Sequence, residues 1–289
     1  MALSRCHHVQ SKASNTPAAR GSQQTVLYRG QGLTAGLSYY APGQRMRRHS
    51  HDYHQVSWLL TGEMLEAGGR QERDLYRFSC GIKPAEFRHE NRYGPAGSLI
   101  LAVNIDPERW PDILPATSNR WQWQAPESPQ TQGQVTQLLA LLTDREEASE
   151  AVILDLVALS RGGVDATPRQ SGRTRRPPAW LAELREQLRD GADNSQLSQL
   201  ADSAGVHRVS LSRRFRRWFG TPPSVYRSRC MLARAMAGLA AGQPIVASAI
   251  SAGFADQAHL TRAARSHTGL TPGALQRLAN HGSGVTSVQ

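Results

Sequence analysis

The sequence contains little cysteine and almost no lysine. Of its 289 residues, three are cysteines (Cys6, Cys80 and Cys230) and two are lysines (Lys12 and Lys83). Three scattered cysteines provide neither a disulfide framework nor a Cys-x-x-Cys metal site, which is typical of a protein from a reducing compartment. The positive charge of the chain therefore comes almost entirely from arginine.

Long apolar runs are also missing. No stretch approaches the ~18–20 apolar residues that a membrane-spanning helix needs, and the first 24 residues lack the apolar core of a secretory signal. Hydrophobic residues make up 39% of the chain, which is enough for the cores of two ordinary domains. We therefore expect a cytoplasmic protein with no membrane partner.

Carboxylates are scarce in one half of the chain. Residues 1–170 carry 18 basic and 17 acidic side chains, whereas residues 171–289 carry 16 basic and 6 acidic ones. The net charge of +11 is therefore concentrated in the C-terminal part. This asymmetry favours a nucleic acid as the partner of that part over a merely solvated basic surface.

The N-terminal part has the pattern of short β-strands. Residues 25–104 contain apolar or alternating runs such as TVLYRG, QVSWLLTG and GSLILAVNI, which glycine, proline and charged turns separate. Such spacing is typical of a sandwich or barrel. From about residue 131 the apolar period becomes helical, first at Val135, Leu138, Leu139 and Leu142, and then at Val152, Leu154, Leu156 and Leu159. Two helices with a short connection form a hairpin.

Residues 161–178 are rich in glycine, proline and arginine and contain almost nothing to bury, so they indicate an interdomain linker. The remaining segments read as helices that glycine or proline punctuates. The predicted organisation is a disordered tail, a barrel, a helical hairpin, a linker, an all-α domain and a second tail, at 1–24, 25–130, 131–160, 161–178, 179–280 and 281–289.

Two features of the all-α domain occur twice. A Gly-Thr-Pro-Pro break at 220–223 has a counterpart in Gly-Leu-Thr-Pro at 269–272, and the turn Ala-Gly-Val at 204–206 has one in Ala-Gly-Phe at 252–254. A small residue, a glycine and an apolar residue between two helices is the helix-turn-helix arrangement. The sequence therefore predicts two helix-turn-helix units in tandem.

The helix after each turn has an outer face suited to the DNA major groove. If Leu211, Phe215 and Trp218 face the core, helical geometry places Val209, Ser212, Arg213 and Arg216 on the opposite side. The outer face of the second unit comprises Gln257, Ala258, Thr261 and Arg262. Arginine can donate a fork of hydrogen bonds to guanine, glutamine can pair with adenine, and small side chains permit close approach. Phosphate contacts are expected from Arg214, Arg217, Arg227 and Arg229.

Residues ~180–279 resemble the DNA-binding domain of the AraC/XylS family of bacterial transcription regulators. The matching segments are LADSAGVHRVSLSRRFRRWFG and ISAGFADQAHLTRAARSHTGLTPGALQR. The resemblance implies seven helices, with two recognition helices entering successive major-groove segments ~34 Å apart. The chain departs from the family at Ala264, where a large aromatic is usual. Val209 and Ala258 are also smaller than usual, so contact with a thymine methyl is expected there.

The N-terminal part contains a histidine-rich phrase. His49 and His51 point to the same side of a strand, followed by Gln55, and a later phrase supplies His89. These phrases resemble the two motifs of the cupin barrel, the usual sensor fold of the family. Metal-binding cupins have a glutamate where this chain has Gln55, so we favour no metal. His49, His51, Gln55 and His89 are instead expected to line an effector pocket, or to be packed without such a role.

The predicted fold class is a multidomain α+β protein, a cupin-like barrel with a helical hairpin followed by a seven-helix domain. The predicted function is sequence-specific transcription regulation that responds to an unidentified small-molecule effector. We expect no enzymatic activity and no required cofactor. The expected partners are double-stranded DNA and RNA polymerase, with a second copy of the chain at the hairpin. The alternative is a cupin enzyme fused to a DNA-binding domain, with its metal held by His49, His51 and His89.

Overall fold

The computed structural model describes most of the two predicted domains. The described residues are 22–114, 121–125, 129–144, 146–161, 177–191, 199, 201–203 and 205–281. The predicted tails 1–24 and 281–289 and the predicted linker 161–178 fall almost entirely outside these residues. The first strand starts at Gln23, slightly before the predicted start of the barrel, because Gln23 pairs with Tyr39 of the next strand.

The N-terminal part is one antiparallel sheet in the order β1-β2-β7-β4-β6-β8, with β3 added to β7 and β5 added to β4. The strands are β1 (Gln23–Gly30), β2 (Leu33–Tyr40), β3 (Arg45–His49), β4 (His54–Gly68), β5 (Gln71–Leu75), β6 (Ser79–Lys83), β7 (His89–Ile105) and β8 (Gln122–Gln124). The two longest strands, β4 and β7, each pair with different neighbours along their lengths, which folds the sheet over itself. We call the unit β1–β8 the barrel.

Alternation along the strands gives the barrel two chemically different faces. On β2, the odd-numbered residues from Leu33 to Tyr39 enter the apolar core, whereas Thr34, Gly36, Ser38 and Tyr40 line a cavity. On β4, Val56 and Trp58 are fully buried in the core, while Gln55 lines the cavity. The strand pattern in the sequence therefore separates a core face from a polar face.

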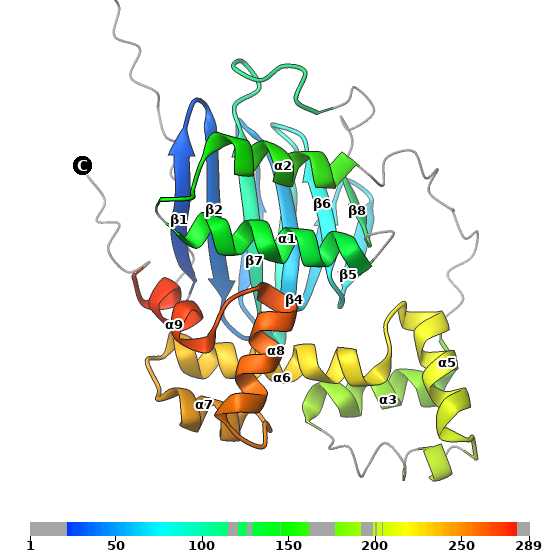
Figure 1. Ribbon diagram of the computed structural model, residues 1–289. Coiled ribbons are helices and arrows are strands. Elements are labelled where there is room, and N and C mark those ends of the chain that lie inside the picture. Colours follow the sequence, from blue (N-terminus) through cyan, green and yellow to red (C-terminus); the bar gives the residue numbers. More distant parts are fainter. Residues whose placement is uncertain are drawn as a thin grey trace, which may run out of the picture.

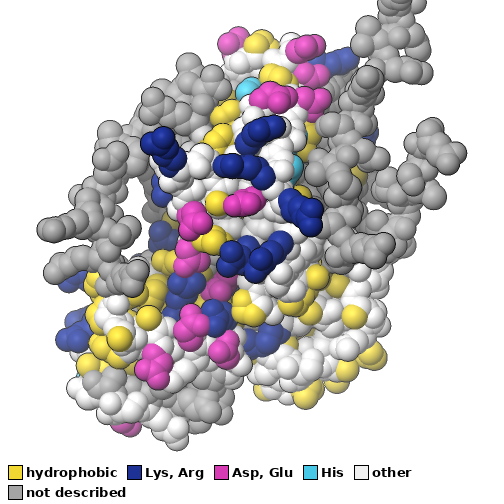
Figure 2. All heavy atoms as spheres, turned by 180° about the vertical axis from the view of Figure 1, so that it is seen from behind, with side chains coloured by type: hydrophobic (Ala, Val, Ile, Leu, Met, Phe, Trp, Pro, Cys, Tyr) yellow, Lys and Arg dark blue, Asp and Glu magenta, His cyan; other side chains and the backbone are white. Residues whose placement is uncertain are grey.

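The hairpin α1 (Pro129–Thr143) and α2 (Glu150–Arg161) covers one face of the sheet (Figure 1). Val135, Leu139 and Leu142 are buried along one stripe of α1, and Ile153 and Leu156 are buried on α2. All five belong to the same apolar cluster as the core face of the barrel. On the opposite face, basic and acidic side chains are intermingled over the described surface (Figure 2).

The C-terminal part is helical. Its elements are α3 (Ala179–Asp190), α5 (Arg208–Phe219), α6 (Pro223–Ala240), α7 (Ile245–Ser251), α8 (Gln257–Thr268) and α9 (Pro272–His281), and residues 199 and 201–203 are also helical. The long helix α6 runs beneath the barrel and joins the two predicted units (Figure 1). Among the described helices, none is long and apolar enough to cross a membrane.

Candidate DNA-reading surface and effector pocket

The two predicted helix-turn-helix units contain the same turn. Gly205 and Gly253 have positive φ angles of 62° and 91°. In the first unit Val206 donates its backbone N–H to the carbonyl of Ala201, and in the second Phe254 donates to Ala249 in the same way. This bond across a left-handed glycine ends one helix and redirects the chain into the next. The repetition seen in the sequence is therefore a repetition of backbone geometry.

Helix α5 is the second helix of the first unit, and its ends are well defined. His207 caps its start by accepting a hydrogen bond from the Val209 N–H at 3.3 Å, and Gly220 ends it in the left-handed region. Leu211, Phe215 and Phe219 are buried. The outward face comprises the exposed Val209, Arg213, Arg216 and Arg217 and the half-buried Ser212. The five residues of α5 that were predicted to contact DNA therefore lie on the outward face of the helix.

Helix α8 has the same design in the second unit. The Asp256 carboxylate accepts from the His259 N–H at 2.6 Å and caps the helix start, and Gly269 ends the helix. Leu260, Ala263 and Ala264 are buried. The predicted residues Gln257, Ala258 and Arg262 are exposed. Thr261 is half-buried, and its hydroxyl donates to the Gln257 carbonyl at 2.8 Å.

Helix α6 joins the two predicted units. Its 18 residues span about 27 Å at 1.5 Å per residue. Both α5 and α8 begin at the end of the helical part that lies away from the barrel (Figure 1). Helix α8 also contacts α6 directly, because His267 Nε2 lies 3.1 Å from the hydroxyl of Ser228 on α6.

One expectation about side chains holds in part and another is wrong. Trp218 packs against the core of Leu211 and Phe215 but is only half-buried, whereas Phe219 is buried and packs on Phe215 with ring centroids 4.5 Å apart. Arg229, expected at phosphates, is 2% exposed and lies between α6 and the barrel. Helical periodicity could not reveal this burial, because the surface that covers Arg229 comes from strand β4, at Leu59 and Thr61.

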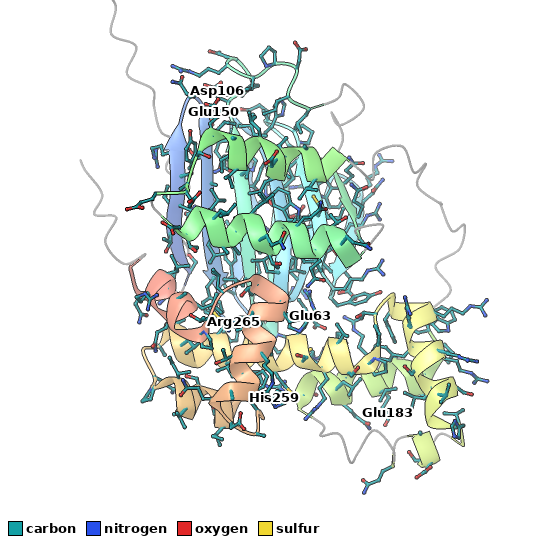
Figure 3. The ribbon with its side chains drawn as sticks, viewed as in Figure 1. Glu63, Asp106, Glu150, Glu183, His259 and Arg265 are labelled. Atoms are coloured by element: carbon teal, nitrogen blue, oxygen red, sulfur yellow. The ribbon has the colours of Figure 1, made fainter. Side chains whose placement is uncertain are left out.

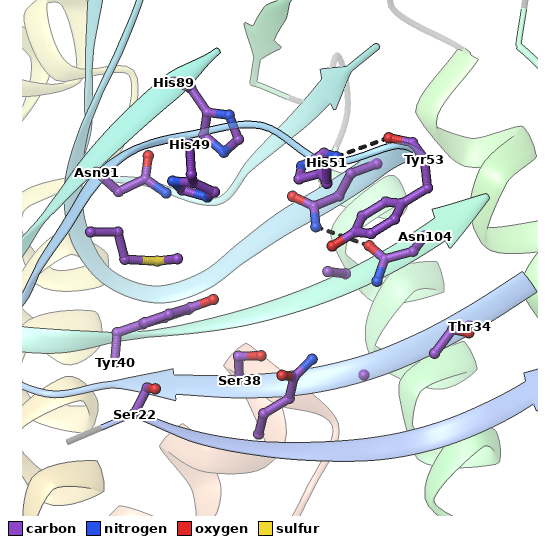
Figure 4. Close-up of a pocket in the computed structure, with 15 residues that line it drawn as sticks. Ser22, Thr34, Ser38, Tyr40, His49, His51, Tyr53, His89, Asn91 and Asn104 are labelled. Carbon is purple, nitrogen blue, oxygen red and sulfur yellow. Dashed lines mark hydrogen bonds between the residues drawn. The ribbon is translucent and has the colours of Figure 1, made fainter. Parts of the chain in front are cut away.

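The predicted pocket residues line one cavity on the polar face of the barrel (Figure 4). The cavity encloses about 100 Å³. His49 and His89 have ring centroids 4.3 Å apart, and His51 lies 5.4 Å from His89. The remaining lining residues, which the sequence analysis missed, are Ser22, Gln24, Thr34, Gly36, Ser38, Tyr40, Met46, Tyr53, Asn91, Ala102 and Asn104. The polar alternation of β2 was the signal that would have found some of them.

The three histidines share one hydrogen-bonding arrangement. The Nδ1 atoms of His49, His51 and His89 lie 2.8, 2.9 and 3.1 Å from backbone carbonyl oxygens. A carbonyl oxygen only accepts, so in the neutral imidazole Nδ1 carries the proton and Nε2 keeps its lone pair. Burial lowers the pKa of His51 to about 4 and that of His89 to about 3, so both are neutral at pH 7. The cavity therefore presents hydrogen-bond acceptors.

The described residues do not fit a metal site. Gln55 occupies the position of the usual glutamate, and its amide donates to Asn104 at 2.9 Å while its oxygen accepts from Ser57 at 3.2 Å. No three His, Cys, Asp or Glu side chains in the described part of the chain are placed to hold a metal ion. We therefore derive no metal chemistry for this pocket. His54 is not among the cavity-lining residues, and it accepts a hydrogen bond from the Ala85 N–H at 3.0 Å.

A buried ion pair lies beside the pocket. Lys83 donates to Glu66 at 3.0 Å, and both are almost fully buried. Burial alone would raise the pKa of Glu66, but the Lys83 ammonium and the indole N–H of Trp123 outweigh it and lower this pKa. The opposite charges of Lys83 and Glu66 cancel within the barrel. The described residues that line the cavity carry no carboxylate, ammonium or guanidinium group.

Comparison with known proteins agrees with this geometry. Residues 200–278 match the family model described as a helix-turn-helix domain. With the repeated turns and the two capped, arginine-bearing helices, this match defines the class: the chain is a DNA-binding transcription regulator. The domain is of the AraC type, which confirms that this region resembles the DNA-binding domain of AraC/XylS regulators.

Solved structures resemble the N-terminal part of the chain. KdgF from Halomonas sp. is 16% identical, with 31% of this chain and 83% of that chain covered and a TM-score of 0.30. A cupin superfamily protein from Desulfitobacterium hafniense is 18% identical, covers the same shares and has a TM-score of 0.28. TM-scores this low do not support an argument about the fold. The description of the barrel as cupin-like therefore rests on the strand pairing described above. No curated protein sequence matches the chain.

Proposed function

We propose that the chain is an effector-responsive regulator that binds two successive major-groove segments through α5 and α8. The observation that carries this proposal is the pair of capped helices with exposed Arg213 and Arg262, one in each unit. Each guanidinium is free to donate a fork to guanine O6 and N7, a contact that discriminates bases.

The other exposed residues have complementary roles in this proposal. Gln257 pairs with adenine, Val209 and Ala258 touch thymine methyl groups, and the hydroxyls of Ser212 and Thr261 contact base edges or backbone. Arg216 and Arg217 lie towards the end of α5, where they meet phosphates and orient the helix. RNA polymerase is the partner through which such binding changes transcription.

The effector we propose is a small uncharged molecule that donates hydrogen bonds. The acceptors are the Nε2 atoms of His49, His51 and His89, and His51 Nε2 is buried without a hydrogen-bond partner in the described structure. Amide groups of Gln55, Asn91 and Asn104 add further donors and acceptors. A charged ligand is disfavoured because no lining side chain would compensate its desolvation.

We also propose a homodimer formed through α1 and α2. On this hairpin Leu141 is 38% exposed, and Leu138 and Leu154, which pack against the core, are only half-buried. An apolar strip on a helix pair that already packs on the barrel is suited to the same strip of a second copy.

The test of the regulator is a DNA selection with the full chain followed by substitution. From random duplexes we expect enrichment of two half-sites about 10–10.5 base pairs apart. Arg213→Ala and Arg262→Ala should each weaken binding to the selected site by about 5- to 150-fold, which is ~1–3 kcal/mol, and should relax one base position each. Arg277→Ala, an exposed arginine on α9, is the matched control.

The salt dependence of binding is a second readout. If about six phosphates are neutralised, log K falls with log[salt] with a slope of about −5. Equal losses for Arg213→Ala on selected and random DNA would show that this side chain contacts only phosphate. A selection that enriches no sequence would overturn the proposal of sequence-specific binding.

A further inference from the structure

The apolar cores do not follow the predicted boundary between barrel and helical domain. One cluster contains the barrel, the hairpin and the second unit, and it includes Leu232 and Leu239 of α6 and Leu260 of α8. A separate cluster holds α3, α5 and the start of α6, with Leu184, Phe215 and Tyr226 among its members. From here on, the first unit means α3, α5 and the start of α6, which hold this separate cluster, and the second unit means the rest of α6 with α7, α8 and α9. The second unit thus shares its core with the barrel, whereas the first unit has its own.

Close backbone contacts join the second unit to the barrel and hairpin. A side chain at Gly269 would overlap the carbonyl of Thr136 on α1, so α1 and α8 touch through their backbones. Gln23 of β1 donates to the Ala240 carbonyl at 2.9 Å, and the Thr25 hydroxyl donates to the Leu278 carbonyl. Ala264 of α8 is fully buried in the same cluster. The second unit and the barrel therefore form one body.

The first unit meets the barrel through the ring of Tyr76, which lies 5.8 Å from that of Phe219, and through polar contacts centred on Glu63 of β4, which Figure 3 labels. The Tyr226 hydroxyl donates to the Glu63 carboxylate, and the Arg185 guanidinium lies 3.5 Å from it. Arg185 also pairs with Asp74 of β5 at 3.0 Å and lies 4.2 Å from the ring centroid of Tyr76. Both partners of Glu63 come from the first unit, one from α3 and one from α6.

The backbone of β4 places Glu63 at this junction. The pairing of β4 with β7 shifts register between Gly62 and Met64, as expected for a β-bulge. Gly62 has a φ of +84°, and any side chain there would overlap the carbonyl of Gly97. Glycine is required for both reasons. The bulge turns Glu63, which is 8% exposed, out of the barrel towards the first unit.

The same junction buries a charge that is poorly compensated. Arg229 is 2% exposed, and its Nε and Nη1 atoms have no hydrogen-bond partner in the described structure. Its Nη2 reaches the Leu59 carbonyl at 3.4 Å. Burial lowers the pKa of Arg229 to about 10, so the environment disfavours its charged form. When the first unit separates from the barrel, water can hydrate the guanidinium of Arg229. This hydration favours the open arrangement.

We propose that docking of the first unit on the barrel through Glu63 is the closed state of a two-state switch, which the buried, unpaired Arg229 keeps easy to open. Opening moves α3, α5 and the start of α6 relative to a fixed second unit, with α6 bending between Cys230 and Met231, where the two apolar clusters meet. The consequence for DNA rests on the proposed function, because it changes the orientation of α5 relative to α8. The docking itself is measurable without DNA or effector.

The test is hydrogen exchange by mass spectrometry on the full chain. Glu63→Gln keeps the shape of the side chain and removes its charge, so peptides from β5 and from α3 should exchange at least tenfold faster than in the wild type. Peptides from α7, α8 and α9 should not change. Glu183→Gln, which removes a carboxylate from the exposed side of α3, is the matched control and should leave every peptide unchanged.

Arg229→Met separates a switch from general loosening. Replacing an unpaired buried charge by an apolar side chain of similar length should slow exchange in the peptides that Glu63→Gln accelerates. Opposite signs for the two variants support the proposal. Uniform acceleration over both units in Glu63→Gln, no change in that variant, or faster exchange in Arg229→Met each overturns it, whatever the outcome of the DNA selection.

Discussion

Acidification should destabilise the barrel through its buried histidines. In the unfolded chain His51 and His89 have pKa values near 6.5, whereas burial lowers these to about 4 and about 3 in the folded protein. Below pH ~6.5 the unfolded state therefore binds more protons than the folded state, so stability falls as pH falls. At pH 5 each histidine is about 1.5 units below its unfolded pKa, which corresponds to a loss of about 2 kcal/mol. Above pH ~6.5 this loss is absent.

Urea unfolding at pH 7 and pH 5, followed by circular dichroism, measures this loss. His89→Gln introduces an amide that does not titrate, so the variant should lose about 2 kcal/mol less than the wild type between the two pH values. An identical pH dependence for wild type and His89→Gln would refute the assignment of a neutral, buried imidazole.

Three further substitutions probe how the recognition helices are built. Asp256→Ala removes the cap of α8 and should lower stability by about 1 kcal/mol in thermal unfolding, whereas Asp256→Asn should retain most of it. Gly269→Ala should destabilise the protein by more than about 1 kcal/mol, because φ at Gly269 is +76° and Thr136 occupies the space that a side chain would need. Gly133→Ala on α1, where no atom outside its own stretch of helix lies within 4 Å of the added methyl group, should instead stabilise it by about 1 kcal/mol. Phe215→Ala should cost about 3–5 kcal/mol in urea unfolding. A loss below about 1 kcal/mol there would contradict the core of the first unit.

Local patterns in the sequence account for the elements and for much of the two sites. Helical periodicity separated buried Leu211 and Phe215 from exposed Arg213, because a helix has a fixed angle between residues. Strand alternation placed His49 and His51 on one side, and both line the cavity. The repeated glycine turns predicted two helix-turn-helix units because left-handed backbone is a local preference of glycine.

Long-range packing accounts for the rest. The positions of Arg229 and Trp218 within their helices do not indicate that the first is buried and the second only half-buried. Elements far away in the sequence decide how much of each side chain is covered. The protonated nitrogen of each pocket histidine depends on which carbonyl lies beside it in the folded chain. The same holds for the assignment of the second unit to the core of the barrel. The spacing of apolar residues along the chain specifies which side of a helix or strand is apolar. Which other helix or strand packs against that side is decided only when the chain folds.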